Sequence, residues 1–316
     1  MAGRPLIRTA PPDAPRSRPA LLSIVSNTVL ILLKVVAGSV TGSVAILTEA
    51  MHSAIDLVAS LVAYVSIRKA DVPADESHPY GHEKVENLAA AIEGMLILVG
   101  SAVIVFEAIR RLLHGGEIEN LGFGIAVIAF SLVVNLIVST YLYKRARETD
   151  SPALEADAAH LRTDAYTSAA VVGGLVLVQV TGQEWLDAVV ALAVALVILV
   201  TGLRIITRSS RVLVDEGLPL AELEVIAETV RTFGPQGVAG FHKLRARRAG
   251  PRRHVDLHVQ FRAGTTLEAA HRTAHALQDA IAARVRNADV LIHLEPEDRV
   301  VPGTEIPAVG LDDDQP

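Results

Sequence analysis

The chain has 316 residues, of which 51% are apolar and 20% charged, and its mean hydropathy is +0.39. A net charge of −6 does not favour a nucleic-acid partner. The absence of cysteine excludes disulfides and thiolate metal sites, so any metal ion must be held by histidine, aspartate or glutamate. Long apolar runs end near residue 206 and ordinary charged sequence follows from residue 211, which predicts a membrane domain followed by a soluble one.

Residues 1–20 are rich in arginine and proline and have no apolar core, so we expect a disordered cytoplasmic arm rather than a signal peptide. The predicted transmembrane domain spans residues 21–210, and the predicted cytoplasmic domain spans residues 211–300. The acidic tail, residues 301–316, is expected to be disordered.

Six apolar stretches are long enough to cross a bilayer core, which takes about 20 residues per helix. In chain order they are residues 21–40, 44–67, 84–113, 123–143, 154–180 and 185–206. Basic residues gather before the first stretch and after the second, fourth and sixth, whereas the opposite joints have almost none apart from Arg110 and Arg111. This asymmetry places both termini in the cytoplasm of a multi-pass inner-membrane protein.

The soluble domain shows a different periodicity. The expected elements are a helix at 220–233, strands at 240–247 and 253–261, a helix at 266–285 with Thr266 as its N-cap, and a strand at 290–294. The order αββαβ predicts a small α+β sandwich with one core.

Two spans share the pattern acid-x-x-His-x-x-x-Asp. It runs from Glu49 through His52 to Asp56, and from Asp157 through His160 to Asp164. The four-residue spacing places each histidine and its aspartate on one helix face. If the two spans pack together, two imidazoles and two carboxylates converge on a four-coordinate site suited to Zn²⁺. Hydrogen bonds within each span are the alternative interpretation, but the repeated pattern favours the metal site.

Other polar residues in or near the spans have several possible roles. Glu49 and Asp157 fit either a place beside the ion pathway or an interfacial or capping role. For the remaining residues we expect packing, snorkelling or interhelical hydrogen bonds; they are Asn27, Lys34, Glu93 and Asn135.

Two further groups have metal-ligand residue types. Asp75, His78 and His82 occupy a short loop rich in proline and glycine between the second and third spans. The soluble domain has six candidates: His242, His258, His271, His275, His293 and Glu295. In both groups solvated histidines are the alternative. We discount His254, which has no acidic partner at a suggestive spacing.

Several motifs together resemble the cation diffusion facilitator family, most closely its bacterial zinc and iron efflux members. They are TGSVAILTEAMHSAIDLVAS, PADESHPYGHEKVENLAA, HLRTDAYTS, LVDEGLP, GFHKLRARRAGP and VLIHLEP, and the resemblance extends from about residue 21 to 301. It implies a homodimeric, non-enzymatic transporter that exchanges divalent metal ions for protons, with six membrane helices and a domain similar to copper chaperones.

The resemblance also implies roles for individual residues. A transport site would comprise His52, Asp56, His160 and Asp164, and a loop site would comprise Asp75, His78 and His82. A binuclear site at the dimer interface would comprise His242, His258, His271, His293 and Glu295. A charge pair joining the protomers would comprise Lys84 and Asp215.

Two departures bear on the metal. The best-known bacterial relatives have aspartate in place of His52, and the histidine form resembles dedicated zinc transporters, which favours Zn²⁺ over Fe²⁺ or Mn²⁺. Glu295 stands where close relatives have aspartate, which leaves the two-metal geometry open.

The rival functions are an Fe²⁺ or Mn²⁺ transporter of the same fold, a membrane metal sensor or scaffold, and an intramembrane zinc hydrolase. The hydrolase would need an open coordination position and a general base, and no His-Glu-x-x-His motif occurs.

Overall fold

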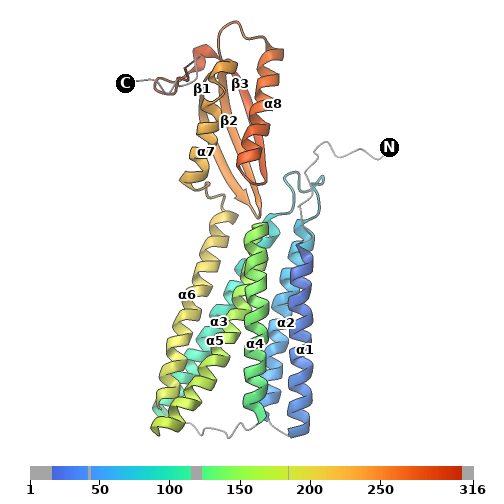
Figure 1. Cartoon of the computed structure of the whole chain (residues 1–316), viewed down its shortest axis with the longest axis vertical. Coiled ribbons are helices and arrows are strands. Elements are labelled where there is room, and N and C mark those ends of the chain that lie inside the picture. Colours follow the sequence, from blue (N-terminus) through green and yellow to red (C-terminus); the bar gives the residue numbers. More distant parts are fainter. Residues whose placement is uncertain (1–15, 42–43, 115–122, 184, 308–316) are drawn as a thin grey trace, which may run out of the picture. The chain divides into compact units, whose positions relative to one another are not determined.

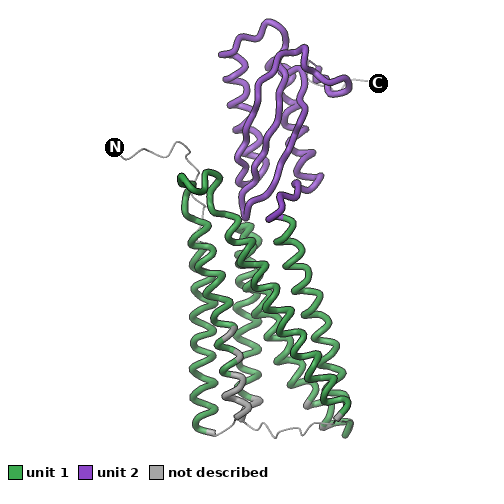
Figure 2. Tube along the Cα trace, turned by 180° about the vertical axis from the view of Figure 1, so that it is seen from behind, with its two compact units in different colours: residues 1–211 green, residues 212–316 purple. Residues whose placement is uncertain are grey.

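The computed structural model describes residues 16–41, 44–114, 123–183 and 185–307 (Figure 1). The chain separates into two compact units, residues 1–211 and residues 212–316 (Figure 2). Each unit is described by itself.

The described residues of the first unit form six long helices. They are α1 (Ser17–Thr41), α2 (Val44–Ala70), α3 (Lys84–His114), α4 (Phe123–Thr149), α5 (Pro152–Thr181) and α6 (Trp185–Leu213). Each contains one predicted span, allowing for a residue or two at the ends, and most extend beyond it. By length and composition, α1, α3, α4 and α6 are apolar enough to cross a membrane. The other two helices, α2 and α5, carry the repeated ionisable pattern.

The bundle is apolar on its outside and lined with small residues inside. Phe106 and Val99 are largely exposed, whereas Ala59, Ala63 and Ala158 are buried. Small residues at helix interfaces are typical of membrane bundles, where close backbone approach replaces the hydrophobic drive. Helix α5 packs against α2, α3 and α4, which brings the two ionisable patterns side by side.

Helices α3 and α6 approach through a pair of glycines. A Cβ atom on Gly202 would lie 3.1 Å from the carbonyl oxygen of Gly94 and closer still to a side-chain carbon of Leu98. Any larger residue at this crossing would therefore push the two backbones apart.

The second unit has the predicted αββαβ order. Its elements are α7 (Leu220–Arg231), β1 (Val238–Ala249), β2 (Arg252–Phe261), α8 (Leu267–Arg284) and β3 (Ala288–Pro296), with short 3-10 turns at Gly234–Gln236 and Glu297–Arg299. The sheet order is β1-β2-β3, with β1 antiparallel and β3 parallel to β2. As predicted, Thr266 caps α8: its Oγ1 accepts a hydrogen bond from the Ala269 N–H at 3.2 Å.

The sheet has one apolar face and one polar face. Val255, Leu257 and Val259 on β2 join the core with α7 and α8. The alternate positions of β2 point to the other face, because successive strand residues point to opposite sides. In the strand register, His258 is paired with His242 on β1 and with His293 on β3. The three histidines therefore form a row across the polar face.

The structure differs from the prediction at both predicted disordered ends. Residues 17–20 belong to α1 and Arg16 is buried, because it meets two carboxylates. At the other end, the Ile306 N–H donates to the Ala239 carbonyl at 2.8 Å, and the Ile306 side chain is buried in the core of the second unit. Residues 301–307 are therefore ordered along the β1 edge. Residues 1–15 and 308–316 lie outside the described residues.

Candidate metal centres

Within the part of the chain that the structure describes, three clusters bring metal-ligand atoms within 4.8 Å of one another. They comprise Asp56, His160 and Asp164; Asp75, His78 and His82; and His242, His258 and Glu295. Each cluster falls within one of the three sites expected from the sequence.

The first cluster lies inside the helix bundle. His160 Nε2 on α5 is 3.1 Å from Asp56 Oδ1 on α2, and both side chains are buried. The contact joins two helices rather than a histidine and its own i+4 aspartate. Asp164, one turn further along α5, also lies within ligand distance. His52 and Glu49 belong to α2, but their side chains lie outside the described residues.

A polar network lies one helical turn from this cluster. Asp157 Oδ1 accepts hydrogen bonds from Ser60 at 2.9 Å and from Ser23 at 3.1 Å, and Asn27 donates to Ser60 at 2.9 Å. Ser60 follows Asp56 by four residues, and Asp157 precedes His160 by three. The network therefore ties α1, α2 and α5 next to the ligands and helps to set their register.

Three more of the polar residues named in the spans are also buried, namely Lys34, Glu93 and Asn135. Lys34 donates to Ser53 at 2.7 Å, which is an interhelical bond of the expected kind. Glu93 is fully buried, and neither of its carboxylate oxygens has a hydrogen-bond partner among the described residues. A buried carboxylate is costly in this state, so simple packing is an incomplete account of Glu93.

The second cluster forms in the loop between α2 and α3. Asp75 Oδ1 lies 3.4 Å from His78 Nδ1, and Asp75 Oδ2 lies 3.4 Å from His82 Nε2. Hydrogen bonds from Ser77 and from the His78 backbone, together with the nearby His82, lower the pKa of Asp75 to about 2. The carboxylate is thus ionised at neutral pH and ready to bind a cation. Gly81 provides the turn before His82 with φ +91°, a conformation that L side chains rarely adopt.

The third cluster lies on the polar face of the sheet. Glu295 Oε2 is 2.9 Å from His242 Nε2, and Glu295 Oε1 is 2.6 Å from His258 Nδ1. Burial would raise the pKa of Glu295, but hydrogen bonds with His258 and Gln260 and the charge of His242 lower it to about 2. The longer carboxylate of glutamate therefore reaches both histidines.

The other two residues implied for this site lie differently. The His293 ring is 4.5 Å from the His258 ring, and its Nε2 is 4.0 Å from Glu295, so it borders the cluster. His271 is exposed on α8, where its ring lies 4.4 Å from that of His275. Helix α8 covers the apolar face of the sheet, whereas the cluster lies on the polar face. Within one chain, His271 is therefore separated from the other proposed ligands.

His254, which we discounted as a metal ligand, lies outside the three clusters, but it has an acidic partner that the sequence spacing did not suggest. Its Nδ1 lies 3.5 Å from Asp289 Oδ2, and this hydrogen bond lowers the pKa of Asp289. The partner is 35 residues away and becomes adjacent only through the β2–β3 register.

The charge pair expected between protomers involves one residue of each unit. Asp215 accepts a hydrogen bond from Arg247 at 3.0 Å, and Lys84 is the first residue of α3 in the other unit. The pairing of Lys84 with Asp215 between protomers stays a prediction.

Comparison with known proteins covers both units. Residues 20–214 match the model of the cation efflux transmembrane domain, and residues 218–297 match that of the cation efflux protein cytoplasmic domain. The uncharacterized transporter sll1263 of Synechocystis is 36% identical over 277 residues, which cover 88% of this chain and 89% of the relative. The cation-efflux pump FieF of Salmonella schwarzengrund is 34% identical over 283 residues, covering 89% and 92%. A solved structure of the putative zinc transporter CzrB in its Zn form is 36% identical, covers 27% of this chain and 96% of that chain, and has a TM-score of 0.26.

Proposed function

The chain belongs to the cation efflux (cation diffusion facilitator) family, and from this premise we propose that it exports Zn²⁺ across the inner membrane in exchange for protons, as a homodimer. Family membership itself makes the protein a multi-pass cation efflux transporter with a cytoplasmic C-terminal domain, and not an enzyme.

The observation that carries the proposal is the cluster of Asp56, His160 and Asp164 between α2 and α5, in which Asp56 and His160 are buried and Asp164 is half-buried. Ionisable residues at membrane depth are expensive and mark ion pathways. His52, one turn before Asp56, would supply the fourth ligand. Two imidazoles and two carboxylates suit the tetrahedral preference of Zn²⁺ and neutralise its charge.

The same donors explain how protons would drive export. Zn²⁺ enters from the cytoplasm when the histidines are neutral and their ring nitrogens are available. When the site opens to the other side, protons compete for the same lone pairs and release the ion. His160 and Asp56 lie 3.1 Å apart, which is close enough for them to share a proton. Such a proton would hold the two side chains together when no metal ion is bound.

The soluble cluster has a regulatory role in this proposal. A metal ion held by His242, His258 and Glu295 adds positive charge to a face whose carboxylates would otherwise repel those of a second copy. His271 lies apart from this cluster within one chain. If it ligates, as the family resemblance implies, the second copy must supply it, and metal binding then favours the dimer.

An Fe²⁺ or Mn²⁺ transporter of the same fold is the main alternative. Harder, carboxylate-rich sites favour Mn²⁺, whereas imidazole donors favour Zn²⁺ and softer ions. The imidazole of His160 in the buried cluster therefore supports zinc. A metal sensor that does not transport is the second alternative, and only flux can separate it.

The test is metal flux into proteoliposomes that contain a fluorescent zinc reporter, under an imposed pH gradient. We expect gradient-dependent Zn²⁺ flux that Asp164→Ala abolishes. Asp279→Ala, a change at an exposed carboxylate on α8, serves as the control and should transport normally. Equal flux in the Asp164→Ala variant would contradict the site, and faster Fe²⁺ or Mn²⁺ flux in competition would contradict zinc. Zinc binding without flux would favour the sensor.

A further inference from the structure

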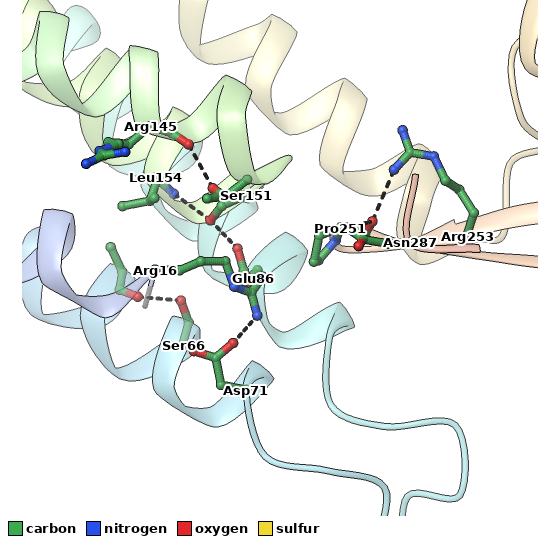
Figure 3. Close-up of polar contacts among 12 residues, drawn as sticks. Arg16, Ser66, Asp71, Glu86, Arg145, Ser151, Leu154, Pro251, Arg253 and Asn287 are labelled. Atoms are coloured by element: carbon green, nitrogen blue, oxygen red, sulfur yellow. Dashed lines mark hydrogen bonds and ion pairs between the residues drawn. The ribbon is translucent and has the colours of Figure 1, made fainter. Parts of the chain in front are cut away.

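Arg16 connects the two ends of the loop that carries Asp75, His78 and His82. Its Nη1 donates to Glu86 Oε1 at 2.5 Å, and its Nη2 donates to Asp71 Oδ1 (Figure 3). Asp71 is the first residue after α2, and Glu86 lies in the first turn of α3. One guanidinium group thus holds together the start and the end of the loop.

The connection is buried. Arg16 is 3% exposed and Glu86 is 0% exposed. Arginine suits this position, because its planar fork can serve two carboxylates on different helices at once. Removing it would leave Glu86 as a buried charge without its countercharge, which is strongly unfavourable.

The loop ligands are tied to these same ends. His82 Nδ1 lies 3.3 Å from the carbonyl oxygen of Val72, the residue after Asp71. The Val85 N–H, one residue before Glu86, donates to the His82 carbonyl at 3.0 Å. Separation of the two loop ends would therefore move His82 away from Asp75.

The network also reaches the helix that carries two residues of the cluster inside the bundle. Glu86 Oε2 accepts a hydrogen bond from Ser151 Oγ, and Ser151 Oγ in turn accepts one from the Leu154 N–H at 3.3 Å (Figure 3). Ser151 is the N-cap of α5, the helix of His160 and Asp164. The loop cluster and the start of α5 are thus joined through Arg16 and Glu86.

We propose that Arg16 is a positioning residue for metal binding in the loop and that it links the loop cluster to the start of α5. The inference rests on the proposed binding of metal by Asp75, His78 and His82. A metal ion that draws these ligands together stabilises the conformation in which the loop ends are joined. By linkage, joining the loop ends raises the affinity of the loop for the metal ion.

The test measures Zn²⁺ binding to the full-length protein by calorimetry. Asp164→Ala and His258→Ala are introduced together, so that of the three clusters only the loop remains intact. In this background Arg16→Gln should weaken the remaining site about 10- to 100-fold, which is the usual effect of removing a residue that orients metal ligands. Arg208→Gln is the matched control. Arg208 contacts Glu155 on α5 at 2.7 Å on the exposed surface, and its loss should leave the affinity unchanged.

A second variant covers the case in which Arg16→Gln does not fold. Asp71→Asn removes only the partly exposed loop end of the network, so it should weaken Zn²⁺ binding while keeping the melting temperature of the metal-free protein. Unchanged affinity in both variants would overturn the inference. Absence of any Zn²⁺ binding in the background would overturn it too, yet would leave transport standing if Asp164→Ala alone abolishes flux.

Discussion

The cluster inside the bundle and the cluster on the sheet use the same donors in opposite surroundings. Asp56 and His160 are buried between helices, whereas His242, His258 and Glu295 are only partly buried on an open sheet face. A buried carboxylate needs a metal ion or a proton to balance its charge, whereas a partly exposed carboxylate remains partly hydrated. The first cluster should therefore be indispensable for flux, whereas the second should tune it.

The largest expected effect tests the buried cluster. Asp56→Asn keeps the volume of the side chain but removes a charged metal ligand. Loss of a residue that only supports the ligands typically lowers activity by up to about 100-fold, so we expect Zn²⁺ flux in proteoliposomes to fall by more than that. The matched change Glu295→Gln in the soluble unit should retain flux at saturating Zn²⁺. Comparable losses in both variants would remove the distinction between the clusters.

Glu295→Gln should instead act on affinity. Because Glu295 contacts both histidines, we expect Zn²⁺ binding at the sheet cluster to weaken by about 10-fold or more. Calorimetry measures it in a background with Asp164→Ala and His78→Ala, which of the three clusters leaves only the sheet cluster intact, and Glu297→Gln is the control. Dimer affinity should lose its dependence on Zn²⁺, and a dimer that still tightens would contradict the regulatory role.

The loop is sensitive to backbone strain. Gly81→Ala forces a side chain onto φ +91° and places its Cβ against the carboxylate of the buried Glu83, which must shift, so we expect about 1–3 kcal/mol of destabilisation and weaker loop binding. Gly264→Ala has a similar φ of +87° but no atom within 4 Å, and it should cost less. Equal melting temperatures in the two variants would argue against the crowding at Gly81.

Acid should weaken the sheet cluster. The pKa of Glu295 is lowered to about 2 in the folded chain, so its contribution to stability is present above its ordinary pKa of 4.5 and is lost as the pH falls toward 2. We expect the melting temperature to drop in this range and to drop less in Glu295→Gln. An identical pH profile in both proteins would mean that the contacts of Glu295 add no stability.

The smallest effect is expected at the pair of His254 and Asp289. Asp289 is largely exposed, so Asp289→Asn, which removes the charge of the pair and leaves the buried His254 in place, should change the free energy of unfolding by about 1 kcal/mol or less. Zn²⁺ affinity at the sheet cluster should not change, as titration of the variant would show. A clear loss of affinity would extend the metal site to this pair.

Much of the architecture could be predicted from short-range pattern. Apolar runs of about 20 residues located all six helices, because a bilayer imposes that length. Alternation and turn residues located the strands of the second unit. The repeated His–Asp spacing on α2 and α5 singled out Asp56, His160 and Asp164, since helical periodicity places such residues on one face.

Composition misjudged the chain ends. Arg16 lies in an arginine- and proline-rich segment whose composition predicts disorder. It is nevertheless buried, because it pairs with two carboxylates from elsewhere in the chain. Ile306 lies in a polar tail, yet it covers the edge of β1. In both cases a distant partner outweighs the local signal.

The sequence by itself determined the spans, the order of the soluble elements and the residue types able to hold a metal, because these follow from local periodicity and side-chain chemistry. Only the tertiary structure decided which donors meet. The contact of His160 with Asp56, the reach of Glu295 to two strands, the pairing of His254 with Asp289 and the bridge made by Arg16 all depend on helix packing or strand register. These join residues far apart in the chain, and no local pattern encodes that proximity.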